Sequence, residues 1–114
     1  MGRKPASPTP EAEPQPLVEA YLTHVRVERR LAARTVALYR QDLLVLQGLC
    51  AQAGVALPAV ERHLVRGWVA RLHAGGRNGR GIARVLSGWR GFYAWLGREG
   101  RVTHNPVADV RAPR

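Results

Sequence analysis

Apolar residues recur with helical spacing near the end of the chain. Between residues 79 and 100 they follow one another at steps of four, three, four and three: Ile82, Leu86, Trp89, Tyr93 and Leu96. Such a stripe is typical of an amphipathic helix with one face in a core. Asn78 suits the N-cap, and Gly100 suits the residue that ends a helix. We therefore predict a helix between these two residues.

Three earlier stretches show the same periodicity and predict helices over residues 16–28, 33–53 and 59–73. Their apolar stripes are, in chain order, Val18, Tyr21, Leu22 and Val25; Val36, Tyr39, Leu43, Leu46 and Cys50; and Leu64, Val65, Trp68, Val69 and Leu72. Gly54 follows the second stretch as a natural C-terminal residue. No segment alternates apolar and polar residues as a strand does. The fold class predicted is all-α, with four helices.

The polar face of the last helix has an unusual composition. On a helical wheel it gathers Arg80, Arg84, Ser87, Gly88, Gly91 and Arg98. A solvated face favours better helix formers, and each interior glycine costs about 1 kcal/mol relative to alanine. Small residues beside arginines let a helix backbone approach a phosphate chain closely. A generic helix from an alanine- and glycine-rich proteome is the alternative interpretation.

Charge favours the phosphate interpretation. The formal net charge is +10, and arginine supplies 17 of the 18 basic residues, with Lys4 the exception. Residues 1–16 balance at zero, residues 17–76 carry +4 and residues 77–114 carry +6. A GC-rich genome explains the choice of arginine over lysine, but it does not explain the shortage of acidic residues. We expect a polyanionic partner.

The sequence gives little support for disulfides, a metal site, a membrane span or catalysis. The single Cys50 excludes a disulfide framework and a cysteine zinc site, and it favours a reducing, cytoplasmic setting. The four histidines never take the spacing of a helical metal pair. No apolar run is long enough to span a membrane. We expect no metal, cofactor or small-molecule ligand and no catalytic residue. Residues 1–16 hold five of the eight prolines and predict a disordered leader.

Three separated motifs resemble Xer-type tyrosine recombinases, with phage and integron integrases as neighbouring families. Residues 31–43 (LAARTVALYRQDL) resemble the start of the second helix in that family. Residues 81–96 (GIARVLSGWRGFYAWL) resemble its pattern SIARxLSxxRxFY. Residues 98–106 (REGRVTHNP) and 110–114 (VRAPR) resemble its exit into an interdomain linker. The resemblance covers nearly everything from residue 17 to residue 114.

The resemblance implies a SAM-like core-binding domain, the N-terminal domain of the lambda-integrase type, over residues 17–100. Residues 101–114 would then begin a linker to a catalytic domain absent from this chain. In the family this domain grips double-stranded DNA at a recombination half-site with its second and fourth helices. The matching DNA-facing positions are Arg34, Thr35, Leu38, Gln41, Arg80, Gly81, Arg84, Ser87 and Gly88.

The resemblance also sets the wider expectations. The full-length parent would be an enzyme that cuts and rejoins DNA with partner recombinase protomers, in chromosome dimer resolution or integration, in the bacterial cytoplasm at the nucleoid. Two positions depart from the family pattern: Ala32 replaces a capping serine, and Gly81 replaces a serine or threonine. Two other functions stay open, a helical protein–protein interaction module and a regulator that occupies recombination sites without cutting.

Overall fold

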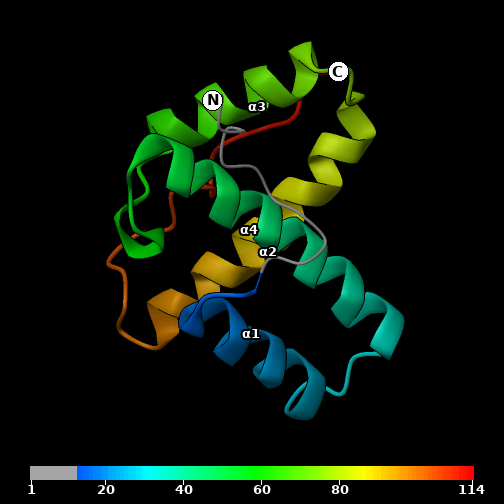
Figure 1. Cartoon of the computed structure of the whole chain (residues 1–114), viewed down its shortest axis with the longest axis vertical. Helices are drawn as coiled ribbons and strands as arrows, with labels where there is room; N and C mark the ends of the chain where they lie inside the picture. Colours follow the sequence, from blue (N-terminus) through cyan, green and yellow to red (C-terminus); the bar gives the residue numbers. More distant parts are fainter. Residues whose placement is uncertain (1–12) are drawn as a thin grey trace, which may run out of the picture. The chain divides into compact units, whose positions relative to one another are not determined.

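The computed structural model describes residues 13–114. Most of the proline-rich leader predicted for residues 1–16 lies outside the described residues. The described chain divides into two compact units, the first ending at Leu57 and the second formed by Pro58–Arg114. The described residues form four α-helices, which Figure 1 labels, in agreement with the predicted all-α class. Within residues 13–114 no helix is long and apolar enough to cross a membrane.

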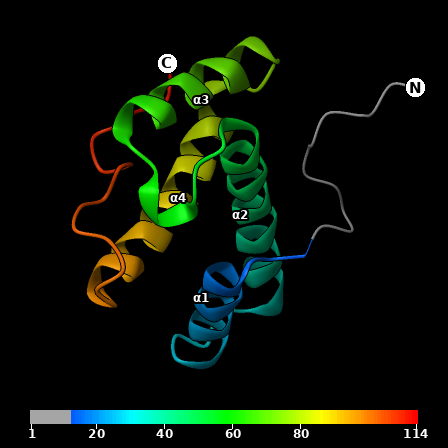
Figure 2. The ribbon, with the colours of Figure 1, turned by 60° about the vertical axis from the view of Figure 1, so that its left-hand side comes forward.

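The first unit is a pair of helices, α1 (Pro16–Val27) and α2 (Ala33–Ala53). The two lie side by side and are joined by a short turn (Figure 2). The four residues of the stripe predicted for the first helix are all buried. In α2, Val36 and Tyr39 are half-buried, and the buried residues are Asp42, Leu43, Leu44, Leu46, Leu49 and Cys50. Tyr21 and Tyr39 stack across the pair, with ring centroids 6.4 Å apart.

The two ends of α2 behave as the sequence predicts. Ala32 occupies the N-cap and makes no side-chain hydrogen bond, because alanine has no acceptor. Gly54 takes the left-handed conformation at φ 69°, which glycine adopts without steric cost. The chain before α1 is tied to α2 by Gln47, whose side chain accepts from the Gln15 N–H and donates to the Glu13 carbonyl.

The third helix begins later than predicted. A 3₁₀ turn, η1 (Leu57–Ala59), spans the division between the units, and α3 (Arg62–Ala74) follows. The predicted start at residue 59 is therefore wrong by three residues. Val60 is only 2% exposed, and Glu61 is extended at φ −110°, ψ 157°. Burial of Val60 thus takes the chain inward before the helix starts.

The last helix, α4 (Gly79–Arg98), supplies most of the core of the second unit. The Asn78 side chain accepts from the Gly81 N–H at 2.8 Å, which confirms the predicted N-cap, and Gly100 has φ 73°. All five residues of the predicted stripe are buried, and the buried surface is wider than the stripe because Val85, Phe92 and Trp95 are buried too. Trp89 packs edge-on against Trp68 of α3, with centroids 6.4 Å apart.

Residues 101–114, the C-terminal segment, fold back onto the second unit. Figures 1 and 2 show this segment, in orange to red, leaving the end of α4 and returning alongside α3. Pro106, Val107 and Val110 are buried. Asn105 donates to the Arg90 carbonyl and accepts from the Val107 N–H, each at 3.0 Å. Asp109 forms an exposed ion pair with Arg62 at 3.3 Å.

Candidate nucleic-acid interface

The residues expected to face DNA on α2 lie near the start of that helix. Arg34, Leu38 and Gln41 are exposed, and Thr35 is half-buried. Positions 34, 38 and 41 are separated by four and three residues, so they share one face of the helix. Leu38 is 42% exposed, one of two large hydrophobic residues on the described surface that are not covered. The helix thus presents a guanidinium, an apolar group and an amide in one row.

Helix α4, the other helix expected to contact DNA, has the same arrangement of exposed residues. Arg80, Arg84 and Ser87 are exposed and have the same spacing of four and three residues. We call these three residues the α4 stripe. Arg34 and Arg80 both occupy the second position of their helices. The glycines beside the stripe, Gly81 and Gly88, are half-buried.

Gly81 also has a structural role at the start of α4. A Cβ at this position would lie 3.3 Å from the Asn78 Oδ1 atom that caps the helix. This contact is tight, so a side chain would crowd the cap. The departure from the family's serine or threonine therefore leaves room for the Asn78 hydrogen bond.

Neither helix exposes an acidic side chain. The α4 sequence contains no aspartate or glutamate, and the one acidic residue of α2, Asp42, is only 4% exposed. The exposed charges on both helices are therefore all positive. Such faces attract polyanions.

The charges at the helix starts run against the helix dipole. Acidic residues stabilise a helix N-terminus, where the dipole is positive, and basic residues there are unfavourable by about 0.3–1 kcal/mol. The first turn of α1 contains Glu19 and the N-cap of α3 is Glu61, as this rule favours. In α2 and α4 the first turn contains no acid, and it carries Arg34 or Arg80 instead.

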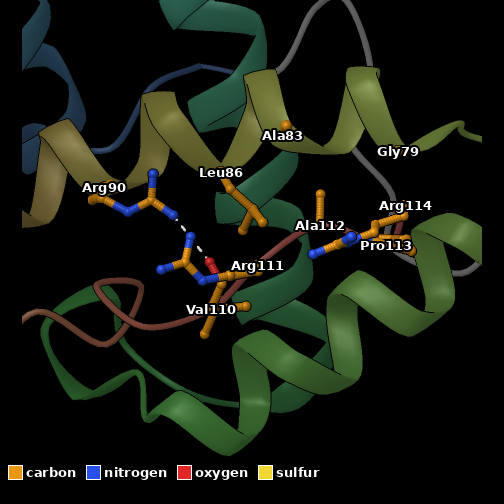
Figure 3. Close-up of a pocket in the computed structure, with 9 residues that line it drawn as sticks. All are labelled: Gly79, Ala83, Leu86, Arg90, Val110, Arg111, Ala112, Pro113 and Arg114. Carbon is orange, nitrogen blue, oxygen red and sulfur yellow. Dashed lines mark hydrogen bonds between the residues drawn. The ribbon is translucent and has the colours of Figure 1, made fainter.

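A third group of arginines lies on a different face of α4. A cavity of about 430 Å³ opens between α4 and the C-terminal segment, and its lining includes Arg90, Arg111 and Arg114. Figure 3 shows Arg90 reaching the Val110 carbonyl, to which its Nη2 donates at 3.0 Å. We call this cavity the arginine pocket. Only the fold of the C-terminal segment brings these three arginines together.

The described residues also include four histidines, three tyrosines and one cysteine. No group of three or more His, Cys, Asp or Glu side chains in residues 13–114 gathers as a metal site would require. Tyr21 and Tyr93 are 2% and 1% exposed, and Tyr39 is half-buried. Burial raises the pKa of the Cys50 thiol from 9.0 to about 12, which keeps it protonated and unreactive.

Comparison with protein families gives one match over most of the chain. Residues 18–100 match the phage integrase, N-terminal SAM-like domain. The matched region begins within α1 and ends just after α4. It contains all nine residues that the sequence placed at the interface.

Individual relatives agree with this match. The chain is 47% identical over 106 residues to tyrosine recombinase XerC 1 of Ralstonia nicotianae, covering 90% of this chain and 32% of that protein. It is 42% identical over 98 residues to tyrosine recombinase XerC of Pseudomonas aeruginosa, covering 85% and 32%. The chain thus spans about a third of the length of these relatives.

A solved structure shares the fold. The integrase from mycobacterium phage Brujita superposes with a TM-score of 0.70 at 22% identity, covering 87% of this chain and 33% of that chain.

Proposed function

The chain belongs to the phage integrase N-terminal SAM-like domain family, and from this premise we propose that it is the DNA-binding domain of a site-specific tyrosine recombinase. It grips the duplex of a recombination half-site with α2 and α4. The full-length protein cuts and rejoins DNA together with partner protomers, in chromosome dimer resolution or integration. Its place is the bacterial cytoplasm, at the nucleoid.

The observation that carries this proposal is the acid-free exposed face of each of the two helices. A duplex presents phosphates along its whole length, so a face that binds it favours basic side chains and excludes acidic ones. The α4 sequence has four arginines and no carboxylate. Partner recombinase protomers would meet the protein elsewhere.

On α2 the exposed side chains suit base edges as well as phosphates. Arginine binds guanine with two hydrogen bonds, glutamine binds adenine in the same way, and an apolar group contacts the thymine methyl. Arg34, Gln41 and Leu38 supply these three groups on one face. Thr35 adds a hydroxyl for a phosphate or a base. The exposure of Leu38, unfavourable in water, is explained by such a contact.

On α4 the stripe suits the phosphate backbone. Arg80 and Arg84 lie one turn apart, close enough to bind neighbouring phosphates from one helix face. Ser87 adds a hydroxyl donor, and the small residues Gly81 and Gly88 allow a close approach of the backbone.

Salt dependence of DNA binding tests the proposal. With about four to six phosphate contacts, log affinity should fall against log salt with a slope of roughly −4 to −5. Fluorescence anisotropy of a labelled duplex across a salt series measures this slope. An interaction module for proteins, the alternative function, would give weak binding that salt hardly changes, and that result would contradict the proposal.

Chemistry on DNA is not expected of this chain. Its tyrosines pack in or against the core, so none is placed to attack a phosphodiester. Incubation with a nicked suicide substrate should give no covalent protein–DNA species on a denaturing gel. A covalent adduct would overturn the assignment of catalysis to another part of the full-length protein.

A further inference from the structure

The arginine pocket has the composition of an anion site. Three of its nine lining residues are arginines and none is acidic. The remaining residues are small or apolar, so the lining has no acidic side chain, and the terminal carboxylate of Arg114 leaves an excess of positive charge. Among the residues that the structure describes, Arg90, Arg111 and Arg114 form no ion pair with a carboxylate. Like charges around one cavity repel, and a bound anion removes this repulsion.

One donor in the pocket has no acceptor. The Arg90 Nε atom is buried and has no hydrogen-bond partner within the described part of the chain. Buried donors are nearly always paired, so an unpaired one calls for a missing ligand or water. The other end of the same guanidinium is held by the Val110 carbonyl. Arg90 is therefore held at the cavity by one donor, while its Nε–H is buried without an acceptor.

The C-terminal segment forms one wall of the arginine pocket, and α4 forms the other. Figure 3 shows Arg111 and Arg114 extending from this segment into the cavity, with Arg111 pointing toward Arg90. The segment lies close to α4 at Gly79. A Cβ at this position would collide with the Pro113 carbonyl oxygen. The start of α4, with its positive dipole end, lies at this wall as well. The pocket exists only while the segment is docked.

We propose that the arginine pocket binds a phosphate group. Guanidinium forks match phosphate oxygens in pairs, and a cavity of about 430 Å³ open to solvent admits such a group. The source is either a backbone phosphate of DNA or free phosphate. Assignment to DNA rests on the proposed function. The pocket residues Gly79 and Ala83 each precede an arginine of the α4 stripe by one residue, and Arg90 follows the last stripe residue by three, so the two faces adjoin on one helix.

Titration of the 114-residue chain with inorganic phosphate at constant ionic strength tests the site. NMR signals of the arginine side-chain Nε–H groups report each guanidinium separately. The signals of Arg90, Arg111 and Arg114 should shift and saturate, with that of Arg90 moving most. Absence of saturation, or equal shifts at every arginine, would overturn the proposal.

Matched variants sharpen this test. Arg111→Ala with Arg114→Ala should weaken phosphate binding about tenfold or more, since each loses charge-assisted hydrogen bonds. Arg66→Ala with Arg101→Ala removes the same charge from exposed positions of the same unit and should weaken it less than about twofold. Equal weakening would show diffuse attraction and sink the proposal.

Adding a short DNA duplex distinguishes the two possible sources of the phosphate, DNA and free phosphate. If the ligand is a DNA phosphate, a short duplex shifts the Arg90 Nε–H signal and inorganic phosphate competes with it. If the ligand is free phosphate, the duplex binds without moving this signal, and the phosphate site still stands. Arg80→Ala with Arg84→Ala should weaken duplex binding and leave the phosphate response unchanged. A chain that binds phosphate at Arg90 but no duplex contradicts only the proposed function.

Discussion

Two glycines of the second unit have opposite surroundings. Gly67, within α3, has nothing within 4 Å of the position its Cβ would take. Gly79, at the start of α4, has the Pro113 carbonyl oxygen 2.1 Å from that position. Real Cβ atoms do not approach backbone this closely. The first glycine is therefore free to change, whereas the second is required by the docked C-terminal segment.

The same substitution at these two sites should change stability in opposite directions. Gly67→Ala should raise the free energy of unfolding by about 0.5–1 kcal/mol, because alanine is the better helix former. Gly79→Ala should lower it by about 1–3 kcal/mol through overpacking. Hydrogen exchange at the Ala108 and Val110 amides, which bond within the C-terminal segment, should quicken only in Gly79→Ala. Unchanged exchange there would contradict the docked geometry.

Cys50 gives a prediction about pH. Burial raises the pKa of its thiol to about 12, so thiol reagents should label it slowly at pH 8 in the native protein and rapidly after unfolding. Below pH 9 the thiol is protonated in both states, and stability is unaffected. Between about pH 9 and 12 only the unfolded state loses the proton, so this residue makes stability fall as pH rises. Rapid labelling of the native protein would contradict its burial.

At the scale of elements, the two helices proposed to bind DNA differ in how they begin. The N-cap of α4 is Asn78, which accepts a backbone hydrogen bond, whereas that of α2 is Ala32, which accepts none. Both caps have extended backbone geometry, with ψ near 168° and 149°. A suitable side chain at either position would therefore be able to cap its helix.

Substitutions at the two N-cap positions should change stability in opposite directions. Ala32→Ser should raise the free energy of unfolding by about 1 kcal/mol, since serine supplies the missing acceptor. Asn78→Ala should lower it by about 0.5–2 kcal/mol. Denaturant melts of the two variants check this. A destabilising Ala32→Ser would show that the extended cap geometry at the start of α2 is wrong.

Sequence periodicity was enough to predict the four helices, because each has an apolar stripe and recognisable end residues. It missed the start of α3, where burial of Val60 overrides the helical pattern. It also missed the docking of residues 101–114. Val107 and Val110 show no helical or strand period, and their burial depends on contacts with residues far away in sequence. The arginine pocket was unpredictable for the same reason.

At the scale of the whole molecule, acidic and basic side chains are unevenly distributed among the helices and the segments between them. The charged side chains exposed on α2 and α4 are all basic, while the acidic residues of the second unit lie outside α4. Two of these, Glu61 and Asp109, pair with His104 and Arg62. Arg62 of α3 thus has an acidic neighbour that partly neutralises it, whereas the arginines of the α4 stripe face no acid of their own helix.

The most direct test compares two pairs of arginines with identical spacing. Arg80→Ala with Arg84→Ala removes the two arginines of the α4 stripe, and Arg62→Ala with Arg66→Ala removes a pair one turn apart on α3. Each double variant lowers the net charge from +10 by two, to +8. A diffuse attraction would therefore weaken equally in both, and neither pair lies in the buried core, so helicity should stay unchanged.

Affinity for a labelled duplex is measured by anisotropy across a salt series. It decides between a specific interface on α4 and a diffuse attraction. The α4 variant should lose about 2–4 kcal/mol of binding free energy, and its salt slope should flatten by about two, as the loss of two direct contacts requires. The α3 variant should lose well under about 1 kcal/mol, the usual size of an exposed charge effect. Equal losses in the two variants would contradict a DNA interface on α4.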